Sequence, residues 1–421
     1  MKLLAEKEII LYESPEPRTC FCGSPSIVVL PGGELAASFN HMGPGTLERD
    51  KLTEVCFSSD GGETWEYRSS LAMKMARVFP AGETLYCLGQ TGKEPPERYG
   101  KPPQLLGHLV IARSEDRGHT WSEPVCLSEG SWHQAPSAWW VRGGNLYIVM
   151  EKVVYDDVEG WNVNGLAPIL MRGKLNSDLT RRENWTFAEA PAFRDVVSEE
   201  ELQYIGLPFY HTDGNRYTDV GGGRGCARMG WLETNVVQIL DKKHFWYDPQ
   251  GKTFHLFLRA HTGMTNYACI MKVTEAEDGS MKTVCEMSPG GKKLVFLPLP
   301  GGHLKFHILY DEQTALYWLL SSQSTDSMTR PELLDESRYS LPDNERHRLT
   351  LHFSKNCVDW CFAGVVAMTS DCRQARSYAS MAIDGEDLVV LSRSGNEFAM
   401  SSHNGNQILF HRVPRFRELV Y

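Results

Sequence analysis

Two stretches decide the fold of this chain, SSDGGETW at residues 58–65 and SEDRGHTW at residues 114–121. They share the pattern S-x-D-x-G-x-T-W, and each follows an apolar run of the kind that forms a β-strand. In a tight turn the aspartate can bond the backbone, the glycine accepts a positive φ, and the tryptophan packs on a neighbouring strand. The pattern therefore predicts two equivalent turns within a repeated β-structure.

Short apolar runs recur along the rest of the chain, for example SIVVL at 26–30, LYIVM at 146–150 and DLVVL at 387–391. They are rich in β-branched or aromatic side chains, and turn residues follow them. A third, shortened copy of the turn, SKNCVDW at 354–360, carries Asn356 in place of the aspartate. Helical periodicity longer than two turns is nearly absent, so the sequence predicts an all-β protein.

A longer unit of four strands surrounds the turns, and we assign six such units to residues 23–72, 75–128, 135–190, 232–285, 303–368 and 376–413. Four-stranded antiparallel sheets arranged radially form a β-propeller, here with six blades. Residues 9–12 would pair with the last sheet and close the ring. Residues 191–231 lack a strand pattern and predict a long loop within a single domain of residues 1–421. A blade hidden there would make the propeller seven-bladed.

Composition excludes several classes of partner. With 43 basic and 53 acidic residues, the net charge of −10 disfavours nucleic acid. No stretch approaches the ~18 uncharged apolar residues of a membrane helix, and the first residues, MKLLAEKE, place charges where a signal peptide is apolar. The 11 scattered cysteines suit thiols in a reducing compartment, so we expect a cytoplasmic protein. We expect neither a metal nor a cofactor, and the sequence does not determine the oligomeric state.

Propeller ligands bind where the inner strands converge, so polar residues at the ends of those strands are the candidates for a site. Together these residues would line the axis with arginine, histidine and aromatic side chains, which suit a sugar that carries a carboxylate. The candidates are His41, Arg77, His133, Trp140, Glu151, Glu233, Arg259, His261, His303, Lys305, Arg346, Arg348, Arg376, Tyr378 and Arg393.

The S-x-D-x-G-x-T-W pattern resembles the Asp-box, or BNR repeat, of the sialidase-like propeller proteins. The resemblance implies a propeller, and it implies a tyrosine nucleophile, for which Tyr378 in RSYASM at 376–381 is the counterpart. It also implies three arginines on the substrate carboxylate, two of which Arg259 and one of Arg346 or Arg348 can supply.

Two family features have no counterpart in this chain. The family's first blade begins with Arg-Ile-Pro, whereas Gly23-Ser24-Pro25 stands here, and the family's acid on an early loop has no equivalent. The substrate is therefore expected to differ from sialic acid.

We predict a sialidase-like exo-glycosidase that cleaves the terminal bond of an acidic or plant-type oligosaccharide. Tyr378, His133 and Glu233 are the predicted catalytic residues. The predicted sugar-binding residues are His41, Arg77, Arg259, His261, His303, Arg346, Arg348, Arg376 and Trp140. One alternative is a β-eliminating lyase that acts beside a uronic acid and resembles the rhamnose–glucuronate lyases. A second alternative is a glycan-binding propeller without catalysis.

Overall fold

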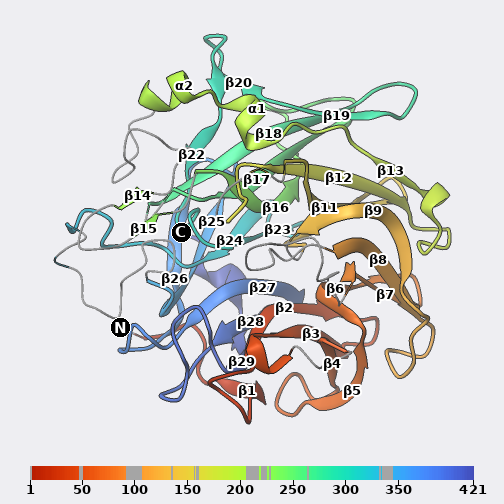
Figure 1. Cartoon of the computed structure of the whole chain (residues 1–421), viewed down its shortest axis with the longest axis vertical. Helices are drawn as coiled ribbons and strands as arrows, with labels where there is room; N and C mark the ends of the chain where they lie inside the picture. Colours follow the sequence, from red (N-terminus) through yellow and green to blue (C-terminus); the bar gives the residue numbers. More distant parts are fainter. Residues whose placement is uncertain are drawn as a thin grey trace.

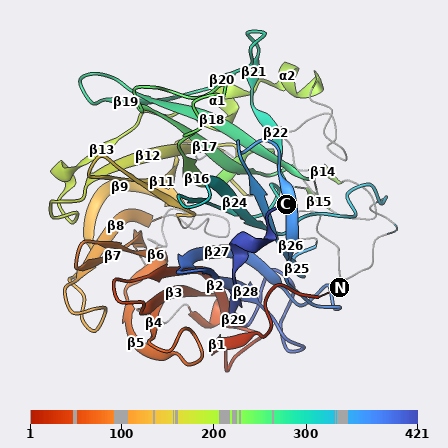
Figure 2. The ribbon, with the colours of Figure 1, turned by 180° about the vertical axis from the view of Figure 1, so that it is seen from behind.

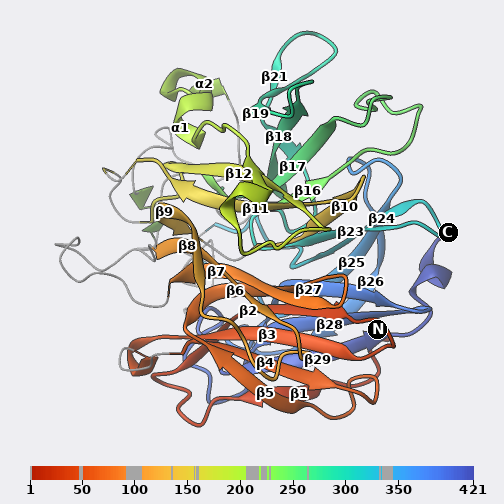
Figure 3. The same cartoon turned by 90° about the vertical axis from the view of Figure 1, so that its right-hand side faces the viewer.

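Antiparallel strands form nearly all of the regular structure in the computed structural model, as predicted. The structure describes residues 2–46, 51–91, 107–133, 136–155, 157, 161–204, 218–219, 225–226, 229–262, 265–330, 333 and 345–421. Two short helices, α1 (Phe193–Val196) and α2 (Glu199–Tyr204), lie beside each other outside the sheets (Figure 3). Within these residues, no helix has both the length and the apolar character needed to cross a membrane.

Five sheets of four or more strands contain most of the described strands. The first sheet is β2 (Phe21–Val29), β3 (Leu35–Met42), β4 (Thr53–Ser58) and β5 (Glu66–Leu71). The second is β6 (Met73–Ala81), β7 (Thr84–Thr91), β8 (Gly107–Ser114), β9 (Val125–His133), β10 (Trp139–Arg142), β11 (Asn145–Val153), β12 (Leu166–Lys174) and β13 (Trp185–Phe187).

The remaining large sheets come from the second half of the chain and from its N-terminal strand. The third is β16 (Trp231–Val237), β17 (Thr253–Ala260), β18 (Tyr267–Glu275), β19 (Met281–Val284) and β22 (Phe296–Pro298). The fourth is β23 (His307–Asp311), β24 (Leu316–Ser321), β25 (Arg348–Ser354) and β26 (Cys361–Met368). The fifth is β27 (Arg376–Asp384), β28 (Asp387–Ser394), β29 (Gln407–Val413) and β1 (Ile9–Glu13). Two hairpins complete the set, β14 (Thr218–Asp219) with β15 (Gly225–Cys226) and β20 (Glu286–Met287) with β21 (Lys293–Leu294).

The sheets surround a common centre (Figures 1 and 2). Their first strands contact one another in succession: β2 contacts β6, β10 contacts β16, β16 contacts β23, β23 contacts β27, and β27 contacts β2. The ring is closed by β1, whose Ile9 pairs with Phe410 of β29, so the predicted pairing of residues 9–12 with the last sheet is confirmed. Each first strand therefore presents its side chains to the same axis, which is the arrangement of a β-propeller.

The predicted count of six separate four-stranded blades needs correction. The second and third predicted units form one eight-stranded sheet, because β9 pairs with β8 and also with β11, where Glu151 lies opposite His133. The seven-bladed alternative finds no support in the described part of residues 191–231, which holds α1, α2 and the β14–β15 hairpin. Much of the predicted loop there, residues 205–217 and 220–224, lies outside the described residues.

The two S-x-D-x-G-x-T-W turns have the same hydrogen bonds. Asp60 Oδ1 accepts from the Thr64 backbone at 3.0 Å, and Asp60 Oδ2 accepts from the Thr64 hydroxyl at 2.6 Å. Asp116 accepts the same two bonds from Thr120, at 2.8 and 2.6 Å. The aspartate thus closes each turn, and this explains why the pattern recurs.

The glycine of each turn packs against the neighbouring sheet. Gly118 has a φ of +80°, and a Cβ there would lie 2.7 Å from the Phe57 ring on β4. Gly62 has a φ of +93°, and its Cβ would lie 2.3 Å from the Phe410 ring on β29. Each turn therefore needs glycine for its backbone conformation and also for its contact with the next sheet.

We expect Gly118→Ala to lower the free energy of unfolding by about 3 kcal/mol, because left-handed strain and overpacking add. Gly82→Ala is the matched control, since Gly82 has a φ of +62° but nothing within 4 Å of its added Cβ. It should cost only about 1 kcal/mol, from the backbone alone. Urea unfolding of both variants measures the difference, and equal losses would show that the Phe57 contact is unimportant.

Candidate active site

The first strands of four units share one irregularity near their beginning. At each, the pairing register shifts and a non-glycine residue adopts a left-handed conformation. The four residues are Ser24 (φ 47°), Met75 (φ 49°), Glu233 (φ 53°) and Tyr378 (φ 62°). Such a conformation costs about 1–3 kcal/mol and is concentrated at functional sites. The bulge turns the side chain away from the ordinary pleat, and for Glu233 and Tyr378 it brings the two side chains together.

Tyr378 and Glu233 form a buried pair at the axis. The Tyr378 hydroxyl donates a hydrogen bond to Glu233 Oε1. Glu233 Oε2 accepts from Arg259 Nη1 at 3.1 Å, and Arg259 Nε donates to the His303 carbonyl at 2.8 Å. All four residues are at least 95% buried. The strands β16, β17 and β27 thus place a phenol, a carboxylate and a guanidinium in one chain of bonds.

Two more cations face the ring of Tyr378. Lys305 Nζ lies 4.9 Å from the ring centroid, and the Arg393 guanidinium carbon lies 3.9 Å from it. Both side chains are buried. Cations at this distance attract the ring face and would also stabilise a negative charge on the phenol oxygen.

The pKa shifts define the resting charges of this cluster. Burial raises the pKa of Tyr378, and the charge of Glu233 raises it further, so the phenol is protonated. Burial acts to raise the pKa of Glu233 as well, but the charges of Arg259 and Lys305 outweigh it and the pKa is lowered. Burial lowers the pKa of Lys305 to about 7, against the opposing effect of Glu233. The cluster therefore holds a carboxylate that can accept the phenol proton and an amine that titrates near neutrality.

Further groups lie around this centre. His303 and His133 are buried, and burial lowers their pKa values to about 3 and about 4, so both imidazoles are neutral at pH 7. The Trp161 ring lies 5.2 Å from the Arg259 guanidinium carbon and 5.0 Å from the ring of His261. An aromatic face beside a guanidinium can cover one side of a sugar ring.

Glu151 is a second buried carboxylate near the axis. Its Oε1 accepts from the Thr234 backbone at 3.0 Å and from the Thr234 hydroxyl at 2.7 Å. Burial raises the pKa of Glu151 to about 7 in spite of these bonds. Glu151 therefore changes charge near neutral pH while Glu233 stays ionised.

The raised pKa of Glu151 predicts a pH-dependent effect of Glu151→Gln. Because the folded-state pKa lies above the unfolded one, near 4.3, Glu151 stabilises the fold fully below that pH, and this contribution is lost as pH rises through about 7. Glutamine does not titrate, so the variant should gain about 2 kcal/mol relative to the wild type between pH 5 and pH 8. Urea midpoints at both pH values measure this, and a constant difference would contradict it.

The structure brings together part of the predicted set. Tyr378, Glu233, Arg259 and His303 form the hydrogen-bonded cluster. Three more predicted residues lie near this cluster. The charge of Glu233 acts on the pKa of His133, the charge of Arg346 acts on the pKa of His303, and the His261 ring packs against Trp161.

Three predicted sugar-binding residues have partners outside this cluster. His41 lies on the second strand of its sheet, 3.0 Å from Glu54 and 3.6 Å from Cys20. The Arg348 guanidinium is 2.7 Å from Glu345. Arg376 binds Glu8 through two contacts of 2.6 Å. These partners place the three residues outside the hydrogen-bonded cluster, and their role in sugar binding stays a prediction.

Two further predicted residues, Arg77 and Trp140, line a cavity at the other ends of the first strands. Conversely, the predicted catalytic and binding set omitted Lys305, Arg393 and Trp161. Lys305 and Arg393 were among the candidates at strand ends but received no predicted role. Trp161 was not a candidate, because it stands in a segment with no strand pattern. Among the described residues, no group of three histidine, cysteine or acidic side chains is arranged to hold a metal ion.

Comparisons with known proteins address the fold. No protein-family model matches the chain, and no curated protein matches its sequence. The solved structure of an α-L-arabinanase from Penicillium chrysogenum with arabinobiose has a TM-score of 0.52 and 14% identity, covering 99% of each chain. A Hadza microbial sialidase has a TM-score of 0.56 and 13% identity, covering 97% of this chain and 68% of its own.

A third similar structure is the α-L-arabinofuranosidase of Fusarium graminearum with arabinobiose. It has a TM-score of 0.52 and 11% identity, and the similarity covers 98% of both chains. At such identities the likeness concerns the fold alone, and it confirms the predicted β-propeller arrangement. The chain has the fold of the sialidase-like β-propeller glycosidases.

Proposed function

We propose that the protein is an exo-acting glycosidase that cleaves the terminal bond of an acidic or plant-type oligosaccharide. The observation that carries this proposal is the buried hydrogen bond between Tyr378 and Glu233, with Arg259, Lys305 and Arg393 around it. Two residues in the left-handed conformation, from different sheets, meet there, and such conformations are concentrated at functional sites. Similar folds with bound arabinobiose support a saccharide ligand.

The proposed reaction begins at the phenol oxygen of Tyr378. Glu233 accepts the phenol proton while the oxygen attacks the anomeric carbon, and the bond from that carbon to the leaving oxygen breaks. The Lys305 ammonium, 4.9 Å from the phenol ring, supplies the proton to the leaving oxygen. Water then attacks the anomeric carbon of this aryl glycoside, and the bond from that carbon to the Tyr378 oxygen breaks. Glu233 returns its proton to the phenol oxygen, Lys305 takes the proton of the water, and the sugar is released.

A tyrosine nucleophile suits an anionic sugar, because a neutral phenol does not repel a carboxylate. The described groups at the centre include the cations Arg259, Lys305 and Arg393 beside the carboxylates Glu233 and Glu151. This balance favours a substrate that brings its own negative charge. We therefore propose that the substrate is an oligosaccharide that carries a uronic acid, rather than a neutral arabinan.

The test is product analysis with a panel of oligosaccharides that end in glucuronate, galacturonate, sialate or arabinose. Release of the terminal acidic sugar, without a rise in absorbance near ~235 nm, is the expected outcome. Sialate as the preferred sugar would contradict the proposed substrate class. Binding of the panel without any cleavage would instead assign a glycan-binding role.

β-Elimination is the second candidate, and the lowered pKa values of two bases at the centre favour it. His133 has a pKa of about 4 and Lys305 a pKa of about 7, so both can accept the proton from C5 of a uronate at neutral pH. The leaving oxygen would then take the proton of Tyr378, and a double bond would form between C4 and C5. A rise near ~235 nm during cleavage would identify this reaction and exclude hydrolysis.

We further propose that the chain acts as one domain and in the cytoplasm. The unbroken ring of sheets supports the first proposal, because β1 pairs with the last sheet. The free thiols among the described cysteines are compatible with the second.

A further inference from the structure

A cavity of about 530 Å³ lies at the ends of the first strands opposite to Tyr378 and Glu233. Its walls are the last residues of β2, β6 and β27, together with β10 and β23. Tyr378 stands near the beginning of β27, whereas Met381, Ala382 and Ile383 of the same strand line the cavity. The cavity is thus a separate opening of the central axis, of the size of a small-molecule site.

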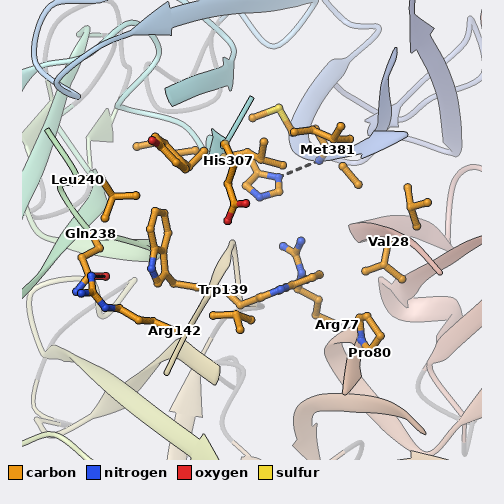
Figure 4. A pocket seen from close by; sticks show the side chains of 18 residues that line it. Val28, Arg77, Pro80, Trp139, Arg142, Gln238, Leu240, His307 and Met381 are labelled. Atoms are coloured by element: carbon orange, nitrogen blue, oxygen red, sulfur yellow. Dashed lines mark hydrogen bonds between the residues drawn. The ribbon is translucent and has the colours of Figure 1, made fainter. Parts of the chain in front are cut away.

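Arg77 supplies a buried positive charge to this cavity. Its side chain is among the largest fully buried ones, and its guanidinium extends into the space bordered by His307, Val28 and Trp139 (Figure 4). Nη1 makes one long hydrogen bond, 3.4 Å, to the Pro136 carbonyl, and Nε has no partner among the described residues. No carboxylate in the described part of the chain lies within 4.0 Å of it.

Such a charge is costly without a counter-ion, because the guanidinium has lost its water. Burial lowers the pKa of Arg77 to about 9, so the side chain is still a cation at pH 7. Its stacking on Trp139, 4.6 Å from the ring centroid, offsets only part of this cost. The arrangement is that of a site prepared for an anion.

The other walls of the cavity indicate what the uncharged part of the ligand is. The ring centroids of Trp140 and Tyr310 lie 5.8 Å apart on one side of the cavity. Val28, Leu240 and Met381 add apolar surface to its walls. These residues suit the faces of a ring. His307 Nδ1 accepts from the Met381 backbone at 2.9 Å, so Nε2 carries the hydrogen and can donate it to a ligand oxygen.

The charges at the rim limit the charge of the ligand. Glu312 and Arg142 both line the cavity and are exposed, and Arg142 binds Gln238 at 2.6 Å. Their opposite charges cancel, which leaves the single charge of Arg77. The balance therefore favours a monoanion over inorganic phosphate.

We propose that this cavity binds the carboxylate of a small ring-bearing organic acid, with Arg77 on the carboxylate and Trp139, Trp140 and Tyr310 on the ring. The ring can be that of an acidic sugar or of an aromatic acid. This site does not depend on the proposed glycosidase activity, because none of these residues belongs to the Tyr378–Glu233 cluster.

Ligand-observed NMR titration of the full chain with D-glucuronate, benzoate, D-glucose, benzyl alcohol and inorganic phosphate tests the proposal. Saturable binding of at least one of the two carboxylates is expected, with at least ~10-fold weaker binding of its neutral counterpart. Glucuronate alone would identify a sugar acid, and benzoate alone an aromatic acid. Binding of phosphate only, or of no carboxylate, would overturn the proposal.

Variants assign the binding to this cavity. Arg77→Met and Trp140→Ala should each weaken carboxylate binding at least ~10-fold, whereas Tyr378→Phe should leave it unchanged. Trp140 is only half-buried, so its variant provides a readout even if Arg77→Met does not fold. Unchanged binding in both cavity variants, or loss of binding in Tyr378→Phe, would contradict the assignment.

Discussion

Tyr378→Phe is expected to lower kcat by roughly 10³-fold or more on whichever oligosaccharide the wild type cleaves. The substitution removes only the phenol oxygen, so the ring keeps its contacts with Lys305 and Arg393. KM should change little, because the proposed sugar contacts come from other residues. Initial rates over a range of substrate concentrations separate the two parameters.

A matched control is Tyr147→Phe on β11. Tyr147 is buried and its hydroxyl also faces a carboxylate, Glu275, at 3.4 Å, but it lies outside the central cluster. This variant should keep the wild-type kcat. Full activity in Tyr378→Phe would mean that the phenol is not the nucleophile and that its bond to Glu233 only holds the two strands together.

Glu233→Ala should cause the largest loss of stability, about 3–5 kcal/mol in the free energy of unfolding. The carboxylate is fully buried, and its removal leaves Arg259 and Lys305 in a low-dielectric centre without their nearest negative charge. Urea unfolding measures the loss. Activity should disappear in parallel, because the acceptor for the Tyr378 proton is gone.

The double variant Glu233→Ala/Arg259→Met distinguishes this cause from simple loss of packing. Removing the guanidinium that lost its partner should restore part of the stability, so the two changes should not add. Glu418→Ala, in an exposed pair with Arg415, is the control and should cost at most about 1 kcal/mol. Additive losses in the double variant would contradict the electrostatic explanation.

Local patterns were sufficient to predict the strands and their closure into a ring. The turns at 58–65 and 114–121 depend on bonds between residues four apart, such as Asp60 with Thr64, and a sequence displays these directly. The apolar runs likewise identify the strands, since the alternation of side chains is a local property. The joining of two units through β9 was not predictable, because it depends on the bend of one long strand between two partners.

For the candidate site, position along the strands predicted Tyr378, Glu233 and Arg259 as neighbours at the axis. It did not predict the partner of Arg376, Glu8, because that residue is 368 residues away in the sequence. It also did not predict that Arg77 lines the cavity, since strand order does not tell which opening of the axis a side chain reaches. The sequence showed which residues are polar at strand ends, but not which of them neutralise each other.

By itself the sequence determined that this chain forms short antiparallel strands, turns closed by aspartate, and a ring, because these features follow from contacts between near neighbours. Only the tertiary structure decided that a phenol from β27 and a carboxylate from β16 meet among cations, and that Arg77 is left without a carboxylate at the opposite opening. Charges interact with whatever the fold brings within a few ångströms, and that is a property of the assembled ring.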